Sequence, residues 1–164
     1  MTAGTAGPEK HMPERTLVII KPDAVQRHLL GEVITRFEKK GLKLVAAKFM
    51  LVPERLARQL YSVHEGRDFY EPLVAYMCSS PVMVTVWEAD GAIAIARKLM
   101  GSTLGFEAEP GTIRGDLSCS TRYNLVHGAD SAESARREIA LFFSHEEIVE
   151  YELADAWWLY GKKG

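Results

Sequence analysis

The sequence predicts a single domain of the α+β class, with an antiparallel or mixed sheet that is covered by helices. Three observations support this prediction. The chain has 164 residues, which suits one domain with one sizeable core. Of these residues, 47% are hydrophobic and 26% are charged, as in ordinary globular proteins. Apolar runs rich in β-branched residues alternate with segments of helical periodicity, in the order β-α-β-αα-β-α-loop-β-α.

The first half of the domain contains two predicted strands and three predicted helical stretches. The run TLVII is continuous and apolar, and Pro22 ends it, which is typical of a buried strand. Gly41 is placed to end a helix, and Pro53 suits the first turn of another. The elements expected here are a strand at 16–20, a helix at 28–41, a strand at 42–50 and helical stretches at 53–61 and 68–77.

The second half contains two further strands, at 81–88 and 123–127. Asp90 is expected to cap a helix over 91–100 that Gly101 ends. Residues 102–123 have several glycines and no clear period, so a long loop is expected, and such loops are usually functional. Capping-box-like pairs open the last two predicted helices: Asp130 with Glu133, and Ser144 with Glu147.

The N-terminal residues carry no predicted structure. Residues 1–13 contain small and polar side chains, and the "HM" before the first strand resembles a cloning remnant, so we expect a disordered tail or tag remnant there. The folded domain is therefore predicted to span residues 14–164.

Charge and cysteine content exclude several classes of protein. The net charge of −2 argues against a general nucleic-acid binder, so no nucleic-acid partner is expected. No apolar stretch approaches the roughly 20 residues that span a bilayer, so no membrane partner is expected either. Cys78 and Cys119 are isolated, which favours a reducing compartment and hence a cytoplasmic protein.

His127 is the first candidate for chemistry, because it ends a predicted strand just before a helix. On that helix Ala135, Ile139 and Phe142 define the buried face, and Glu138 lies on or beside the same face, whereas Arg137 is expected to point away and to pair with Glu133. A buried carboxylate needs a partner, and the histidine is the obvious one. A neutral imidazole oriented by a carboxylate is a competent nucleophile. The spacing alone leaves a purely structural pair equally open.

Cations and one aromatic ring are weaker candidates. Lys21 is expected at the exposed end of the first strand, Arg97 interrupts an apolar helix, and Arg114 lies in the glycine-flanked PGTIRGD. Arginines in these settings can clamp phosphates, but each is more often a surface charge. Phe69 could stack a base or belong to the core. Phosphate-binding P-loop, dinucleotide, zinc-protease and serine-hydrolase motifs are absent, and the histidines show no metal-ligand spacing, so no protein-held metal is expected.

Three segments together resemble the nucleoside diphosphate kinases: ERTLVIIKPDAVQR, PGTIRGD and NLVHGADSAESARREI. The resemblance is ordered and runs from about Glu14 to the C-terminus. It implies a ferredoxin-like fold, a four-stranded antiparallel sheet covered by helices, assembled as a hexamer or tetramer. It also implies ping-pong transfer of the γ-phosphoryl group from a nucleoside triphosphate to a nucleoside diphosphate, with Mg²⁺ carried by the nucleotide phosphates.

The resemblance assigns roles to ten residues. His127 matches the histidine that becomes phosphorylated, and Glu138 matches the glutamate that orients it. Phe69 matches the ring that stacks on the base, and Asn124 the ribose contact. The remaining matches are on the ribose and phosphates or line the same cleft: Lys21, Arg97, Thr103, Arg114, Tyr61 and Leu73. The DAWWLYGKKG tail resembles those of hexameric members, so we expect a hexamer.

The sequence departs from the family pattern at three places. Ala24 replaces a frequent glycine, which we expect to be harmless. Ala129 stands where the family usually has serine, which should leave Glu138 with one hydrogen-bond donor fewer. Leu104-Gly105 replaces the usual Asn-Pro in a loop implicated in subunit contacts, so any effect should fall on assembly rather than chemistry.

Two other functions compete with a kinase. A non-catalytic assembly or regulatory protein could keep the fold, but it would need neither His127 nor the nucleotide contacts. A nucleic-acid-binding module of ferredoxin-like shape would need exposed aromatics on its sheet, whereas the strands here are mainly aliphatic.

Overall fold

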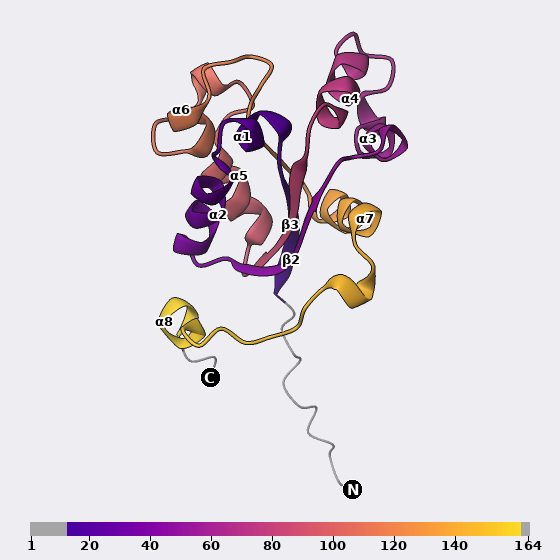
Figure 1. Ribbon diagram of the computed structural model, residues 1–164. Helices are drawn as coiled ribbons and strands as arrows, with labels where there is room; N and C mark the ends of the chain where they lie inside the picture. Colours follow the sequence, from indigo (N-terminus) through magenta and orange to yellow (C-terminus); the bar gives the residue numbers. More distant parts are fainter. Residues whose placement is uncertain (1–12, 162–164) are drawn as a thin grey trace, which may run out of the picture.

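The sheet has four strands and helices on both of its faces in the computed structural model, which describes residues 13–161 (Figure 1). Its strands are β1 (Glu14–Ile20), β2 (Lys43–Met50), β3 (Val82–Ala89) and β4 (Val126–Gly128). They lie in the order β2-β3-β1-β4, and neighbouring strands are antiparallel. The ferredoxin-like α+β fold is therefore confirmed, and the mixed sheet is excluded. Apart from Pro13, the predicted tail over residues 1–13 lies outside the described residues.

Alternation along β1 explains why both faces of the sheet carry helices. Leu17 and Ile19 point into one core cluster, and Val18 and Ile20 point into the other. The first face is covered by α3 (Glu54–Leu60), α4 (Tyr70–Cys78) and α7 (Ala132–Phe142). The second is covered by α2 (Leu30–Lys39) and α5 (Ala92–Met100). A strand that is buried on both faces reads as a continuous apolar run, as TLVII does.

Glycines with a positive φ lie at the ends of two helices. Gly41 follows α2 with φ +92°, and the backbone N–H of Leu42 donates to the carbonyl of Phe37, which closes a Schellman-type cap. Gly101 ends α5 as predicted. The predicted Asp90 cap is wrong: the residue at the N-cap of α5 is Gly91, whose φ of +72° is unfavourable for residues with a Cβ.

Short helices account for the main differences from the sequence prediction. The predicted loop over 102–123 contains η2 (Gly105–Glu107) and α6 (Ile113–Leu117), and Thr112 caps α6 by accepting from the N–H of Gly115. The stretch that Ser144 and Glu147 open is a 3₁₀ turn, η3 (His145–Glu147), with both capping-box bonds present. Three further short elements outside this loop were not predicted: α1 (Pro22–Gln26), η1 (Ser62–His64) and α8 (Ala156–Tyr160).

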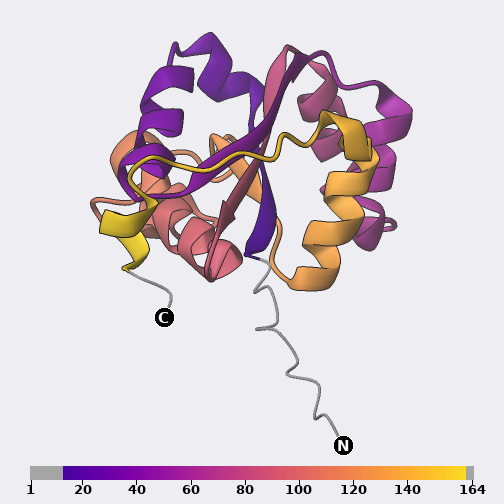
Figure 2. The same ribbon diagram turned by 90° about the horizontal axis from the view of Figure 1, so that it is seen from below.

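The C-terminal segment crosses the outer edge of β2 and ends beside α2 (Figure 2). The N–H of Val149 donates to the carbonyl of Val45 at 2.8 Å, and the hydroxyl of Tyr160 donates to the carbonyl of Gly41 at 2.6 Å. The bond from Val149 thus takes up a carbonyl of β2 that an open sheet edge would leave unpaired.

Within residues 13–161, none of the helices is both long enough and apolar enough to cross a membrane.

Candidate active site

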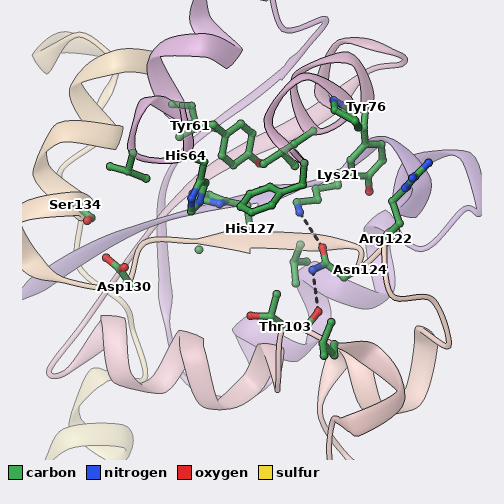
Figure 3. Close-up of a pocket in the computed structure, with 18 of the residues that line it drawn as sticks. Lys21, Tyr61, His64, Tyr76, Thr103, Arg122, Asn124, His127, Asp130 and Ser134 are labelled. Carbon is green, nitrogen blue, oxygen red and sulfur yellow. Dashed lines mark hydrogen bonds between the residues drawn. The ribbon is translucent and has the colours of Figure 1, made fainter. Parts of the chain in front are cut away.

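A cavity of about 910 Å³ opens between the α3–α4 region and the segment that runs from α5 to β4 (Figure 3). Its floor is formed by β4, and α7 contributes to one side. The cavity is lined by all ten residues to which the resemblance assigns roles: Lys21, Tyr61, Phe69, Leu73, Arg97, Thr103, Arg114, Asn124, His127 and Glu138. The fold thus brings together residues that are up to 117 positions apart in the chain, since they range from 21 to 138.

His127 and Glu138 form a close hydrogen-bonded pair in this cavity. His127 lies on β4, where its backbone pairs with Ile19 of the central strand β1. Its Nε2 is 2.7 Å from Oε2 of Glu138, and the glutamate side chain is only 5% exposed. An ionised carboxylate can only accept a hydrogen bond, so the imidazole donates its Nε2–H. The lone pair of Nδ1, on the other side of the ring, is therefore free to react.

The N-cap of α7 sets where the helix begins, and with that start Glu138 falls on the buried face. Ser131, rather than the predicted Asp130, is the N-cap, and its hydroxyl accepts from the N–H of Ser134 at 3.1 Å. From that start, Ala135, Glu138 and Phe142 are the buried residues of the helix. The inward direction of Glu138 that the spacing predicted is confirmed.

The predicted direction of Arg137 is wrong. Arg137 lines the cavity, and its Nη2 lies 3.5 Å from Oε1 of Glu138. Its Nη1 donates to the carbonyl of Gln59 at 3.2 Å. The long, flexible arginine side chain turns back toward the buried carboxylate, whose charge attracts it more strongly than an exposed Glu133 would.

Lys21 is buried, contrary to the expectation that a loop exposes it. It is the N-cap of α1, and its side chain passes beneath Tyr76 to donate from Nζ to Oδ1 of Asn124 at 2.8 Å. The amide of Asn124 donates in turn from Nδ2 to the carbonyl of Thr103 at 3.0 Å, as the dashed lines of Figure 3 show. Since the carbonyl of Thr103 can only accept, Nδ2 of the amide must face it and Oδ1 faces Lys21.

Burial and a neighbouring cation lower the pKa of Lys21 to about 7. Removal of the ammonium group from water is the larger cause, and the positive charge of Arg114 is the next. Asp23 opposes both by favouring the charged form. Near neutral pH this lysine therefore exchanges readily between its charged and neutral forms.

Arg114 is held by backbone carbonyls. Its guanidinium donates to Gly101 at 2.9 Å, to Asn124 at 3.1 Å and to Val126 at 2.6 Å. Burial, followed by the charge of Arg97, lowers the pKa of Arg114 to about 10, so the group stays charged at neutral pH. A guanidinium has five N–H groups, and these three bonds leave two for a ligand in the part of the chain that is described.

Arg97 supplies a second, more exposed cation from α5. Together Arg97, Arg114 and Lys21 make one side of the cavity strongly positive. Such a cluster suits a ligand that carries several negative charges.

Tyr61 packs edge-on against His127, with ring centres 5.6 Å apart. Its hydroxyl is buried and has no hydrogen-bond partner among residues 13–161. Burial and the nearby charge of Glu138 raise the pKa of this tyrosine, so it remains a neutral donor. A buried, unpartnered hydroxyl beside the histidine is suited to receive a ligand oxygen.

Phe69 presents an exposed ring at the cavity entrance, and Leu73 lies one turn further along α4. Phe69 is 47% exposed, with the edge of His64 on one side and the guanidinium of Arg67 5.9 Å from the ring centre. Part of the ring remains open to a planar ligand.

The sequence reasoning missed several residues of the cavity. Tyr76 lies over Lys21 and donates from its hydroxyl to Asp23, and Asp23 also accepts from the N–H of Leu125 at 3.1 Å. Asp23 follows Lys21 by two positions in the chain, and this proximity was the one clue to the contact. His64 and Arg122 also line the cavity, on irregular segments whose local pattern gives no clue to their direction.

Two departures from the family pattern have structural explanations. Ala129 is buried against Ile93 and Ala135, and in place of a neighbouring hydroxyl the second oxygen of Glu138 meets Arg137. Gly105 packs so closely on Ser118 that an added Cβ would lie 2.5 Å from its carbonyl and hydroxyl oxygens. A side chain, or a proline ring, therefore does not fit there.

The described part of the chain contains no group of three or more histidine, cysteine, aspartate or glutamate side chains arranged to hold a metal ion. The cavity does contain donors and cations, among them Arg97, Arg114 and the hydroxyl of Tyr61, and these suit anionic oxygens.

The family model described as nucleoside diphosphate kinase matches residues 14–148 of this chain. A nucleoside diphosphate kinase of Staphylococcus epidermidis is 53% identical over 147 residues, which cover 90% of this chain and 99% of that protein.

Solved structures give the same result. A halophilic nucleoside diphosphate kinase from Halobacterium salinarum, in complex with CDP, has a TM-score of 0.88 and 45% sequence identity, covering 90% of this chain and 99% of that one. A transition-state mimic of the nucleoside-diphosphate kinase from Borrelia burgdorferi, with bound vanadate and ADP, has a TM-score of 0.87 and 36% identity, covering 92% and 99%. The fold and the chain length agree with these proteins nearly throughout.

Proposed function

Since the chain belongs to the nucleoside diphosphate kinase family, whose members transfer phosphoryl groups between nucleotides through a phosphohistidine, we propose that His127 carries the phosphoryl group in this enzyme. The observation that carries the proposal is the hydrogen bond between Nε2 of His127 and the buried carboxylate of Glu138. It orients the ring and leaves the second nitrogen free toward the cavity.

The reaction has two half-steps that share one geometry. In the first, the lone pair of Nδ1 attacks the γ-phosphorus of a nucleoside triphosphate, and the bond from that phosphorus to the β–γ bridging oxygen breaks. The electron pair leaves with the nucleoside diphosphate. In the second half-step, a terminal phosphate oxygen of another nucleoside diphosphate attacks the phosphorus, and the P–N bond breaks. The carboxylate of Glu138 stabilises the partial positive charge that the ring develops when it bonds to phosphorus.

The cations of the cavity stabilise charge on the phosphates. Phosphoryl transfer needs positioning and charge neutralisation more than covalent chemistry. Arg114 offers its two remaining N–H groups from a fixed guanidinium, and Arg97 approaches from α5. The hydroxyl of Tyr61, buried and unpartnered among the described residues, lies on the histidine side, where it can donate to a transferred oxygen.

The sugar and base occupy the outer part of the cavity. Asn124 is held by Lys21 and Thr103, which leaves one amide N–H for a ribose hydroxyl. Phe69 stacks on the base, and Leu73 lines the same cleft. Stacking with few contacts to the base edges carries little information about base identity, so several nucleotides should be accepted.

The metal ion of the reaction arrives with the substrate. Mg²⁺ bound to the nucleotide phosphates is the form expected, because the cavity offers cations and neutral donors rather than a cluster of carboxylates.

Assembly as a hexamer and a cytoplasmic location complete the proposal. Trp158 is 83% exposed and Trp157 50% exposed at the C-terminal helix, an apolar surface that association would bury. Both cysteines are unpaired, which suits a reducing compartment.

Incubation with γ-labelled ATP tests the proposal directly. The protein should retain label that is acid-labile and alkali-stable, as expected of phosphohistidine, and the label should move onto added GDP. His127→Ala should not label. Stoichiometric labelling of His127→Ala would show that another residue carries the phosphoryl group.

A further inference from the structure

We propose that Arg137 is a positioning residue that acts on His127 through Glu138, a role that rests on the phosphohistidine mechanism above. The two oxygens of Glu138 have different partners: Oε2 meets Nε2 of His127 at 2.7 Å, and Oε1 meets Nη2 of Arg137 at 3.5 Å. The carboxylate is therefore held between the imidazole and the guanidinium.

Burial makes the second partner of Glu138 important. The glutamate side chain is 5% exposed, and a buried carboxylate oxygen is costly when nothing donates to it. Ala129 contributes a methyl group where the family usually has a hydroxyl, so Arg137 supplies a donor in this chain. The arginine side chain is 37% exposed, so solvent screens part of its charge, and its effect should be moderate.

A second bond fixes the guanidinium in place. Nη1 of Arg137 donates at 3.2 Å to the carbonyl of Gln59, in the last turn of α3, where carbonyls lack helical partners. Tyr61 follows two residues later and packs edge-on against His127, with ring centres 5.6 Å apart. Arg137 therefore contacts Glu138, which bonds to the imidazole, and also the end of α3, which leads to the Tyr61 ring beside the imidazole. Loss of Arg137 would therefore loosen the carboxylate of Glu138, which orients the ring.

Arg137 also lines the cavity, so direct contact with a phosphate is the competing role. The two roles have different kinetic consequences. A residue that acts through Glu138 changes the rate of phosphoryl transfer to His127 and leaves nucleotide affinity alone. A residue that touches phosphate changes affinity, and it does so whether or not Glu138 is present.

The variants Arg137→Met and Arg137→Lys, with Arg136→Met as the matched control, separate these roles. Arg136 is the adjacent arginine on the same helix and is exposed. In single-turnover labelling with ATP, Arg137→Met should slow phosphorylation of His127 roughly tenfold, the change expected from one charge-assisted hydrogen bond. The half-saturating ATP concentration should stay within about twofold of wild type. Arg137→Lys keeps the charge without the two-pronged geometry, so it should recover part of the rate, and Arg136→Met should match wild type.

A double-mutant cycle with Glu138→Gln gives the sharpest test. If Arg137 acts through Glu138, adding Arg137→Met to Glu138→Gln should slow the reaction by less than about twofold. A full tenfold loss in the Gln background, a raised half-saturating concentration without a slower rate, or an equal loss in Arg136→Met would each overturn the proposal. A wild-type protein that does not label would overturn the phosphohistidine mechanism and this role together. A labelling wild type with an unchanged Arg137→Met overturns only the role of Arg137.

Discussion

Nζ of Lys21 and Oδ1 of Asn124 lie 2.8 Å apart in a buried hydrogen bond, although 103 positions separate the two residues in the chain. The bond joins the end of β1 to the start of β4, the strand that carries His127. The lysine is thus part of the floor of the cavity, and its charge responds to whatever binds there.

Nucleotide binding should be accompanied by proton uptake at about pH 8. The pKa of Lys21 is lowered to about 7, so the group is mostly neutral at that pH without nucleotide. A polyphosphate brings negative charge, which favours the ammonium form and raises the pKa. Calorimetry in buffers of different ionisation enthalpy should give an uptake of up to about one proton per site, falling toward zero near pH 5.5, where Lys21 is already charged. Lys21→Met should bind without this uptake at pH 8; the same uptake in that variant would assign the proton to another group.

Glu138→Gln should slow phosphorylation of His127 while nucleotide affinity changes little. The neutral amide keeps the shape of the side chain but no longer stabilises positive charge on the ring, at a cost of roughly 1.5–3 kcal/mol in the transition state. Rapid-quench measurement of the labelled enzyme checks the rate. Unchanged turnover would return Glu138 to a structural role.

Arg97→Ala should lower kcat/KM about tenfold, because one charge-assisted contact to phosphate is lost from an exposed side chain. Its melting temperature should stay close to that of wild type, because no hydrogen bond from Arg97 to the described part of the chain contributes to the fold. Wild-type kinetics would remove Arg97 from the phosphate-binding group.

Ala129→Ser should raise the rate of His127 phosphorylation a few-fold if the new hydroxyl donates to Glu138. The gain is limited because Arg137 already approaches the second oxygen, and a net hydrogen bond is worth about 0.5–1.5 kcal/mol. The hydroxyl must also fit beside Ile93 and Ala135, so the melting temperature should be measured alongside the rate. A fall in both quantities would mean that the site is adapted to the methyl group.

Light scattering over a dilution series should give the mass of a hexamer. Trp157 and Trp158 pack together with ring centres 5.9 Å apart, and both are largely exposed in the single chain. Large apolar surfaces of this kind are usually buried by association. A monomer or dimer that persists at high protein concentration would contradict the prediction.

Local pattern was sufficient to predict most of the elements that form the cores. The buried runs of β1 and β3 and the faces of α2 and α7 follow from β-branched composition and from helical spacing. The five-residue helices α1, α6 and α8 were missed, because one turn of helix is too short to show a period and is held by contacts distant in sequence. In α8, for example, the side chain of Leu159 packs beside Gly41, and the hydroxyl of Tyr160 donates to the carbonyl of Gly41.

Local pattern likewise predicted some features of the candidate site and missed others. Spacing along α7 placed Glu138 toward the interior beside His127, because helical geometry fixes the direction of a side chain close to the backbone. The predicted directions of the Lys21 and Arg137 side chains were wrong. Both side chains are long, and their partners come from other parts of the chain: Asn124 for Lys21 and the carbonyl of Gln59 for Arg137. The local spacing of residues does not show which distant residue a long side chain will contact.

The three carbonyl bonds of Arg114 have a consequence for the solubility of its variants. β4 is an edge strand of the sheet, and the guanidinium donates to the carbonyl of Val126 at its start and to that of Asn124 two residues before it, so it covers part of this edge. An uncovered strand edge is a template for pairing with another chain. Arg114→Ala should therefore aggregate on expression or heating, and Arg114→Lys should do so in part, because one ammonium cannot reach all three carbonyls. We therefore expect this cavity-lining residue also to protect the protein from self-association.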